Sequence, residues 1–237
     1  MSSIKKNARI AGLLYLLLAI TAPISLMYVP SALYVRGDVA ATANNIRSSE
    51  VLFRAGIVYE LTAQAVALFV AWALYPSLKA VSPLQALLMV PLSVISTCTT
   101  FLNTLSQIAG LVILRGADFL SIFTKHQLDA FAYVFFWLQN NGMQAASIFW
   151  WLWLSLFGFL VLKSGFSPKT LGVLLIMNGF AYLAAGSIFF LLPQYGSILQ
   201  RMLIPAAIVE PAVVLWLLTK NTRDVAVEPP TPIQELA

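Results

Sequence analysis

The chain has 237 residues, of which 60% are apolar and 10% are charged, and its formal net charge is +5. Soluble globular domains contain roughly 45–50% apolar and about 25% charged residues, so this composition excludes an ordinary soluble domain. An apolar exterior is stable in lipid, and we therefore predict an integral membrane protein. Basic residues stand singly at the ends of apolar segments, which indicates topogenic charge and no nucleic-acid partner. With Cys98 and His126 as the single cysteine and histidine, we expect no metal cluster and no cofactor.

Six apolar segments are each long enough to cross a bilayer, which takes about 20 residues. They cover residues 10–28, 51–75, 84–114, 138–162, 170–192 and 199–219. We predict an all-α integral membrane protein, a six-transmembrane-helix bundle that forms one domain over residues 1–220. Residues 221–237 are rich in proline and are predicted to be a disordered cytoplasmic tail. The first segment follows basic residues, as in a signal peptide, but its length and the lack of a small-residue cleavage site favour an uncleaved helix.

The orientation follows from the distribution of lysine and arginine, which favour the cytoplasmic side. If the N-terminus is inside, the two short cytoplasmic loops carry Lys79, Lys163 and Lys169 and no acidic residue. The outer segments mix basic and acidic residues, among them Arg36, Asp38, Arg115 and Asp118. We predict a protein of the cell inner membrane with both termini in the cytoplasm and membrane lipids as its surroundings.

Two outer segments have helical patterns of their own. Asp38 precedes residues 40–47, which predicts a short surface helix capped by this aspartate. In residues 119–137, Leu128, Phe131, Val134 and Phe135 recur at helical spacing among polar residues, which predicts an interfacial helix on the outer face. The alternative is an early start of the fourth span.

Two glutamates, Glu60 and Glu210, stand inside predicted spans. A charged group at mid-membrane costs about 2.5–3.5 kcal/mol on insertion scales, so each carboxyl is expected to face the bundle or water. Other polar residues recur at spacings of three or four, which places them on one face of each helix. The candidate ligand-binding residues are Glu60, Gln64, Asn103, Gln107, Asn140, Gln144, Asn178, Tyr182 and Glu210.

At about 1.5 Å rise per residue, these candidates gather from the middle of the membrane outward. We therefore predict a polar cavity that opens towards the outside. The alternative is that these side chains form interhelical hydrogen bonds and leave no cavity. Pro211 follows Glu210 and leaves the carbonyl of Ala207 without its helical partner, a break that favours a site or a hinge. The tryptophans are interpreted as lipid anchors, with an aromatic-lined pocket as the alternative.

The order of several short motifs resembles the DUF4386 family, a group of bacterial multi-pass membrane proteins without an assigned function. The matching stretches are residues 9–15 (RIAGLLY), 45–47 (NIR), 52–54 (LFR), 162–175 (LKSGFSPKTLGVLL), 179–183 (GFAYL) and Glu210 followed by 215–218 (LWLL). The resemblance spans nearly the whole chain and implies the multi-pass topology, but no chemistry. Val209-Glu210-Pro211 departs from the family's usual pattern around this acid.

Three functions remain open at this point, because the chain has no phosphate loop, no dinucleotide fingerprint and no HExxH motif. The first is a protein that binds or transports a small amphiphile or lipid in the outward-facing cavity. The second is an accessory or sensory membrane protein with purely structural polar contacts. The third is a membrane-embedded enzyme that uses the glutamate pair on a lipid-like substrate, which would require the two carboxyls to lie close together.

Overall fold

The computed structural model describes residues 3–165, 168–195 and 206–219, and all regular structure in these ranges is helical. Five stretches of the described chain are long and apolar enough to cross a membrane. They are Arg9–Leu33, Glu50–Leu78, Pro83–Arg115, Lys125–Lys163 and Lys169–Leu191. Each contains or closely matches one of the first five predicted spans, so five helices capable of spanning a membrane are confirmed at these positions.

The predicted sixth span, residues 199–219, is described only in part. The chain from Ala206 to Thr219 forms a helix, α9, and its Val209–Thr219 stretch is apolar but shorter than a full span. Residues 199–205 and the predicted tail at 221–237 lie outside the described residues. The count of six spans therefore stays a prediction.

The first span is a broken helix. Helix α1 (Ser3–Pro23) passes into a π-helical turn, η1 (Ile24–Tyr28), and then into the short helix α2 (Val29–Leu33). Pro23 has no backbone N–H to donate, and a π turn is a common way for a helix to continue past such an interruption. Helix α3 (Val39–Ser48) follows and turns the chain into the second span.

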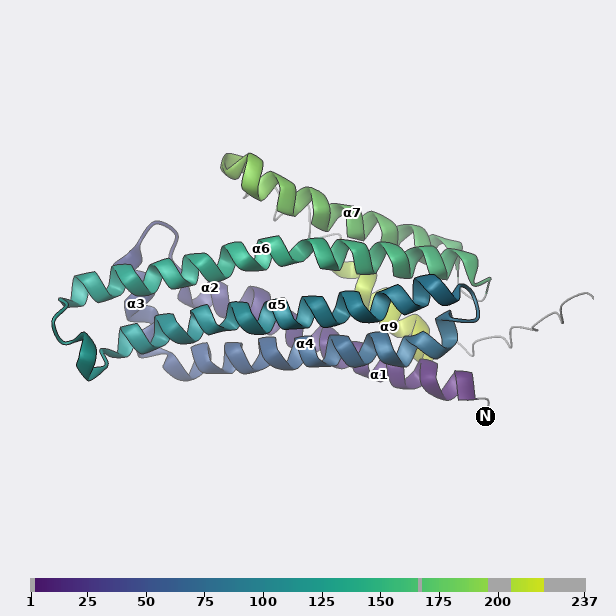
Figure 1. The fold of residues 1–237 in the computed structure, drawn as a ribbon, viewed down its shortest axis with the longest axis horizontal. Coiled ribbons are helices and arrows are strands. Elements are labelled where there is room, and N and C mark those ends of the chain that lie inside the picture. The colour runs from purple at the N-terminus through teal and green to yellow at the C-terminus, as the bar shows by residue number, and fades with distance from the viewer. Residues whose placement is uncertain (1–2, 166–167, 196–205, 220–237) are drawn as a thin grey trace, which may run out of the picture.

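The remaining long helices form an up-and-down bundle. They are α4 (Glu50–Leu78), α5 (Pro83–Arg115), α6 (Lys125–Lys163) and α7 (Lys169–Leu191), with 3-10 turns η2 (Asp118–Leu120) and η3 (Pro193–Tyr195) in the connections. They run alongside one another, with α3 and the α5–α6 connection at one end and the start of α1 at the other (Figure 1). A Cβ on Gly12 would touch Leu217 and Leu218, so the Thr219 end of α9 lies beside the start of α1.

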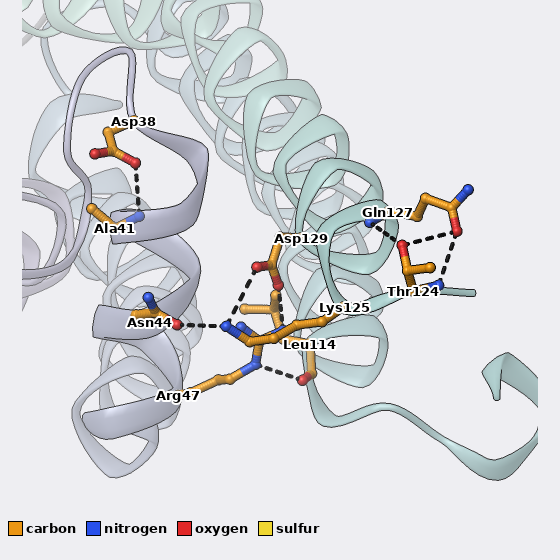
Figure 2. Close-up of polar contacts among 9 residues, drawn as sticks. All are labelled: Asp38, Ala41, Asn44, Arg47, Leu114, Thr124, Lys125, Gln127 and Asp129. Atoms are coloured by element: carbon orange, nitrogen blue, oxygen red, sulfur yellow. Dashed lines mark hydrogen bonds and ion pairs between the residues drawn. The ribbon is translucent and has the colours of Figure 1, made fainter. Parts of the chain in front are cut away.

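The separate interfacial helix predicted over residues 119–137 is wrong, and the alternative, an early start of the fourth span, is correct. Helix α6 runs unbroken for 39 residues from Lys125. A capping box fixes this start, because Gln127 N donates to Thr124 Oγ1 at 3.4 Å and Thr124 N donates to Gln127 Oε1 at 2.9 Å (Figure 2). At about 1.5 Å per residue, α6 is far longer than a hydrocarbon core of about 30 Å.

Helix α3 confirms the predicted short helix, and Asp38 caps it by accepting a hydrogen bond from Ala41 N at 2.8 Å (Figure 2). The Arg47 guanidinium pairs with the Asp129 carboxylate on α6, and its Nε donates to the carbonyl of Leu114 at 3.0 Å. This one side chain therefore ties α3 to both α5 and α6 at the end of the bundle.

Candidate functional site

A cavity of about 150 Å³ lies inside the bundle, between α1, α4, α5, α6, α7 and α9. Its polar lining groups come from Tyr15, Gln64, Ser93, Ser96, Tyr182 and Glu210, and its aromatic lining also includes Phe149, Trp150 and Trp153. Aliphatic side chains such as Leu18, Leu26 and Val70 complete the wall. A largely apolar cavity with a few converging polar groups is the usual form of a small-molecule site.

Glu210 places a carboxyl group at the edge of this cavity. The side chain is half-buried, and the hydroxyls of Tyr15 and Tyr182 lie close enough to its carboxyl to interact with it. These three residues come from α9, α1 and α7, so the carboxyl links three helices that are distant in the sequence. Pro211 lies inside α9, which is helical from Ala206 to Thr219, so the proline does not break the helix as the sequence suggested.

Another part of the lining is aromatic. Trp150 Nε1 donates to Ser96 Oγ on α5 at 3.2 Å, and the Trp150 ring packs edge-on against Tyr182 with centroids 5.7 Å apart. Trp153 packs against Phe157 at 5.3 Å. Trp150 and Trp153 therefore belong to the aromatic-lined cavity that was the alternative to lipid anchoring. Trp137, whose side chain is exposed, has the position expected of a lipid anchor.

Glu60 lies in a different environment and is not among the described residues that line the cavity. It is 4% exposed, and its carboxylate accepts a hydrogen bond from Gln107 Nε2 on α5 at 2.7 Å. Tyr34, just beyond the first span, is close enough for Glu60 to influence it. Burial raises the pKa of the Tyr34 phenol and the Glu60 carboxyl adds to this rise, so Tyr34 stays uncharged at physiological pH.

The other candidate residues are divided among several environments. Of the nine, Gln64, Tyr182 and Glu210 line the cavity. Asn103 Nδ2 donates to the carbonyl of Gln139 at 2.7 Å, which is an interhelical contact between α5 and α6. Asn140 is exposed on α6 and Gln144 is half-buried. Asn178 is 3% exposed, and neither its side-chain oxygen nor its nitrogen has a hydrogen-bond partner among the described residues.

Tyr15 is a polar lining residue of the cavity that is absent from the nine candidates. It is 2% exposed, and its hydroxyl lies beside the Glu210 carboxyl. Its one signal in the sequence is a hydroxyl group in the otherwise apolar stretch from Ile10 to Ile20. A tyrosine in a membrane helix is so often an interfacial anchor that this signal alone does not separate the two roles.

The heights of these groups along the bundle follow from the helical rise of about 1.5 Å per residue. By that measure Tyr15 lies roughly 9 Å from Arg9, and Glu210 lies roughly 14 Å from Thr219, both counted from the end of the bundle that holds the N-terminus. Along the first span, the lining residues run from Tyr15 to Leu26, around its middle. Glu60 lies one turn before Gln64 in α4, so it is further from the end of the bundle that holds the N-terminus. The predicted outward opening stays a prediction.

Among the described residues, no group of three or more His, Cys, Asp or Glu side chains is placed to hold a metal ion. No curated protein and no solved structure matches the chain. A family model described as a domain of unknown function, DUF4386, matches residues 10–221. That range includes every described residue that lines the cavity, and the chain belongs to the DUF4386 family.

Proposed function

We propose that this membrane protein binds a small, mainly apolar molecule in the cavity between α1, α4, α5, α6, α7 and α9. The observation that carries the proposal is the cavity itself, a space of about 150 Å³ in the middle of the bundle with one carboxyl group in its wall. A purely structural set of polar contacts would leave no such space, because helices in membranes associate by close packing.

The size of the cavity limits the ligand. A cavity of about 150 Å³ accommodates a molecule about as large as benzene. The ligand, or the part of it that enters the bundle, is therefore of the size of one ring with a short substituent. A whole phospholipid exceeds this volume, so we narrow the expected ligand to a small amphiphile whose polar end reaches Glu210.

The enzyme alternative finds less support. Its mechanism needs two carboxyls on one pocket, as acid and base. Glu210 lines the cavity, whereas Glu60 bonds to Gln107 one turn beyond Gln64 and is not among the described lining residues. We propose binding, with transport as the extension that a site in the middle of the spans allows.

A panel of fluorinated probes tests the proposal: 4-fluorobenzylammonium, 4-fluorobenzyl alcohol and 4-fluorobenzoate, observed by ¹⁹F NMR with the protein in nanodiscs. We expect saturable binding of at least one probe beyond its partition into empty nanodiscs. Ala67→Phe and Ala22→Leu fill the cavity from α4 and α1 and should abolish this binding. Ala145→Phe, on the exposed face of α6, should retain it.

Binding by wild type and Ala145→Phe that both filling variants lose would support the proposal. Thermal unfolding of each variant confirms that it is folded. If no probe binds in a saturable way, or if both folded filling variants bind as wild type does, the proposed function is wrong.

A further inference from the structure

The charge of the cavity wall says more about the ligand than its size does. Among the described lining residues, Glu210 is the one acidic residue, and none is a lysine or an arginine. The Glu210 carboxyl therefore has hydroxyl neighbours, Tyr15 and Tyr182, but no cation among these lining residues. A buried carboxylate without a counter-charge is costly in a membrane interior.

The two hydroxyls beside the Glu210 carboxyl leave room for a further donor. A carboxylate has about four lone-pair positions, and the hydroxyls of Tyr15 and Tyr182 can occupy at most two of them. An ammonium group carries up to three N–H donors and a full positive charge, so it supplies both the missing counter-charge and the missing donors.

The aromatic lining favours the same class of ligand. Trp150, Trp153, Phe149, Tyr15 and Tyr182 all contribute rings to the wall. Aromatic rings attract cations through their quadrupoles, and this attraction is strongest where water is excluded. A carboxyl beside several rings is therefore more suited to an organic cation than to an anion or to a neutral molecule of the same shape.

We propose that the cavity selects a small, protonated organic amine, with its ammonium group at Glu210 and its apolar part among Trp150, Trp153 and Leu154. This inference rests on the proposed binding function and names its ligand class. The competing arrangement is a protonated, neutral Glu210 that binds an uncharged molecule, and the two arrangements differ in which probe binds best.

The test compares two nearly isosteric probes, 4-fluorobenzylammonium and 4-fluorobenzyl alcohol, at pH 7, where the amine is protonated. In wild type we expect the ammonium probe to bind about tenfold more tightly than the alcohol, a difference in the range that a charge-assisted hydrogen bond supplies. 4-Fluorobenzoate should bind least. Glu210→Gln should remove this preference, so that the ammonium probe binds no more tightly than the alcohol does.

Tyr182→Phe is the matched control, because it removes a hydroxyl partner of Glu210 but keeps the charge. It should preserve the preference for the ammonium probe. If Glu210→Gln fails to fold, the affinities of the ammonium and alcohol probes can still be compared in Tyr182→Phe.

Three results would overturn the inference, and they can be distinguished from one another. If the alcohol binds as tightly as the ammonium probe, and Ala67→Phe abolishes both, the cavity binds ligands but does not select cations. If no probe binds in a manner that Ala67→Phe abolishes, the proposed function fails and the inference fails with it. A preference for ammonium that Glu210→Gln leaves intact also contradicts the role assigned to Glu210.

Discussion

Arg47 and Asp129 form an ion pair whose contribution depends on how far each side chain is buried. The Asp129 side chain is 5% exposed and that of Arg47 is 26% exposed, and Lys125 Nζ lies 3.9 Å from the same aspartate. Arg54 and Glu50 form a second pair at 2.7 Å, but their side chains are 50% and 31% exposed. Exposed pairs contribute little to stability, whereas a buried charge that loses its partner is costly.

Asp129→Asn is therefore expected to destabilise the protein more than Glu50→Gln does. We expect a loss of about 2 kcal/mol for Asp129→Asn, which is below the usual cost of a fully buried broken pair because Arg47 is partly exposed. Glu50→Gln should cost less than about 1 kcal/mol. Equilibrium unfolding by denaturant in mixed micelles measures both, and equal losses would show that burial does not separate the two pairs.

At the scale of helices, α6 and α7 pack through glycines that allow their backbones to approach. A Cβ on Gly172 would lie 2.8 Å from the carbonyl oxygen of Gly158, and a Cβ on Gly158 would lie 2.7 Å from that of Gly172. Small residues at such crossings are a common means of association in membranes, where water does not drive helices together. This contact holds α7, which carries Tyr182, against α6, which carries Trp150 and Trp153.

Gly172→Val should separate these two helices. The added side chain would collide with backbone, which does not yield as a flexible side chain does, and we expect a loss of about 1–3 kcal/mol. Ala184→Val, on an exposed face of the same helix, is the control and should change stability by less than about 0.5 kcal/mol. Thermal unfolding in detergent compares the two variants, and a Gly172→Val protein as stable as wild type would show that this contact is not close-packed in the membrane.

At the scale of the whole molecule, consecutive long helices alternate in direction, so their connections lie at opposite ends (Figure 1). Ala80 stands between α4 and α5, and Ser121 stands between α5 and α6; both are exposed. Thr219 lies at the same end as Ala80, because α9 ends beside the start of α1. The predicted orientation therefore places Ala80 and Thr219 on the cytoplasmic side of the membrane and Ser121 on the outer side.

Labelling of single cysteines tests the orientation. In a Cys98→Ser background, a membrane-impermeant maleimide should label Ser121→Cys on intact cells. It should label Ala80→Cys and Thr219→Cys only after permeabilisation, because the basic loops favour the cytoplasm. The reverse pattern would keep the fold and overturn the orientation, and labelling of Ala80→Cys and Ser121→Cys from one side would contradict the bundle.

The sequence by itself determined the membrane class, the first five spans and the Asp38 cap, because these depend on local composition, on segment length and on one side chain beside its own helix. The sequence also identified four candidate ligand-binding residues, Glu60, Gln64, Tyr182 and Glu210, because a polar group inside an apolar span is easily recognised. It did not separate an interfacial helix at residues 119–137 from an early start of α6, because both have the same helical spacing.

Only the tertiary structure decided which of these polar groups meet. Periodicity assigns a residue to a face of its helix, but it does not say which neighbouring helix that face contacts, or at what height. Glu210 therefore came together with Tyr15 from the opposite end of the sequence, while Glu60 paired with Gln107 outside the cavity lining. The cavity is formed by six helices jointly, and which residues line it depends on how those helices rotate and pack against one another.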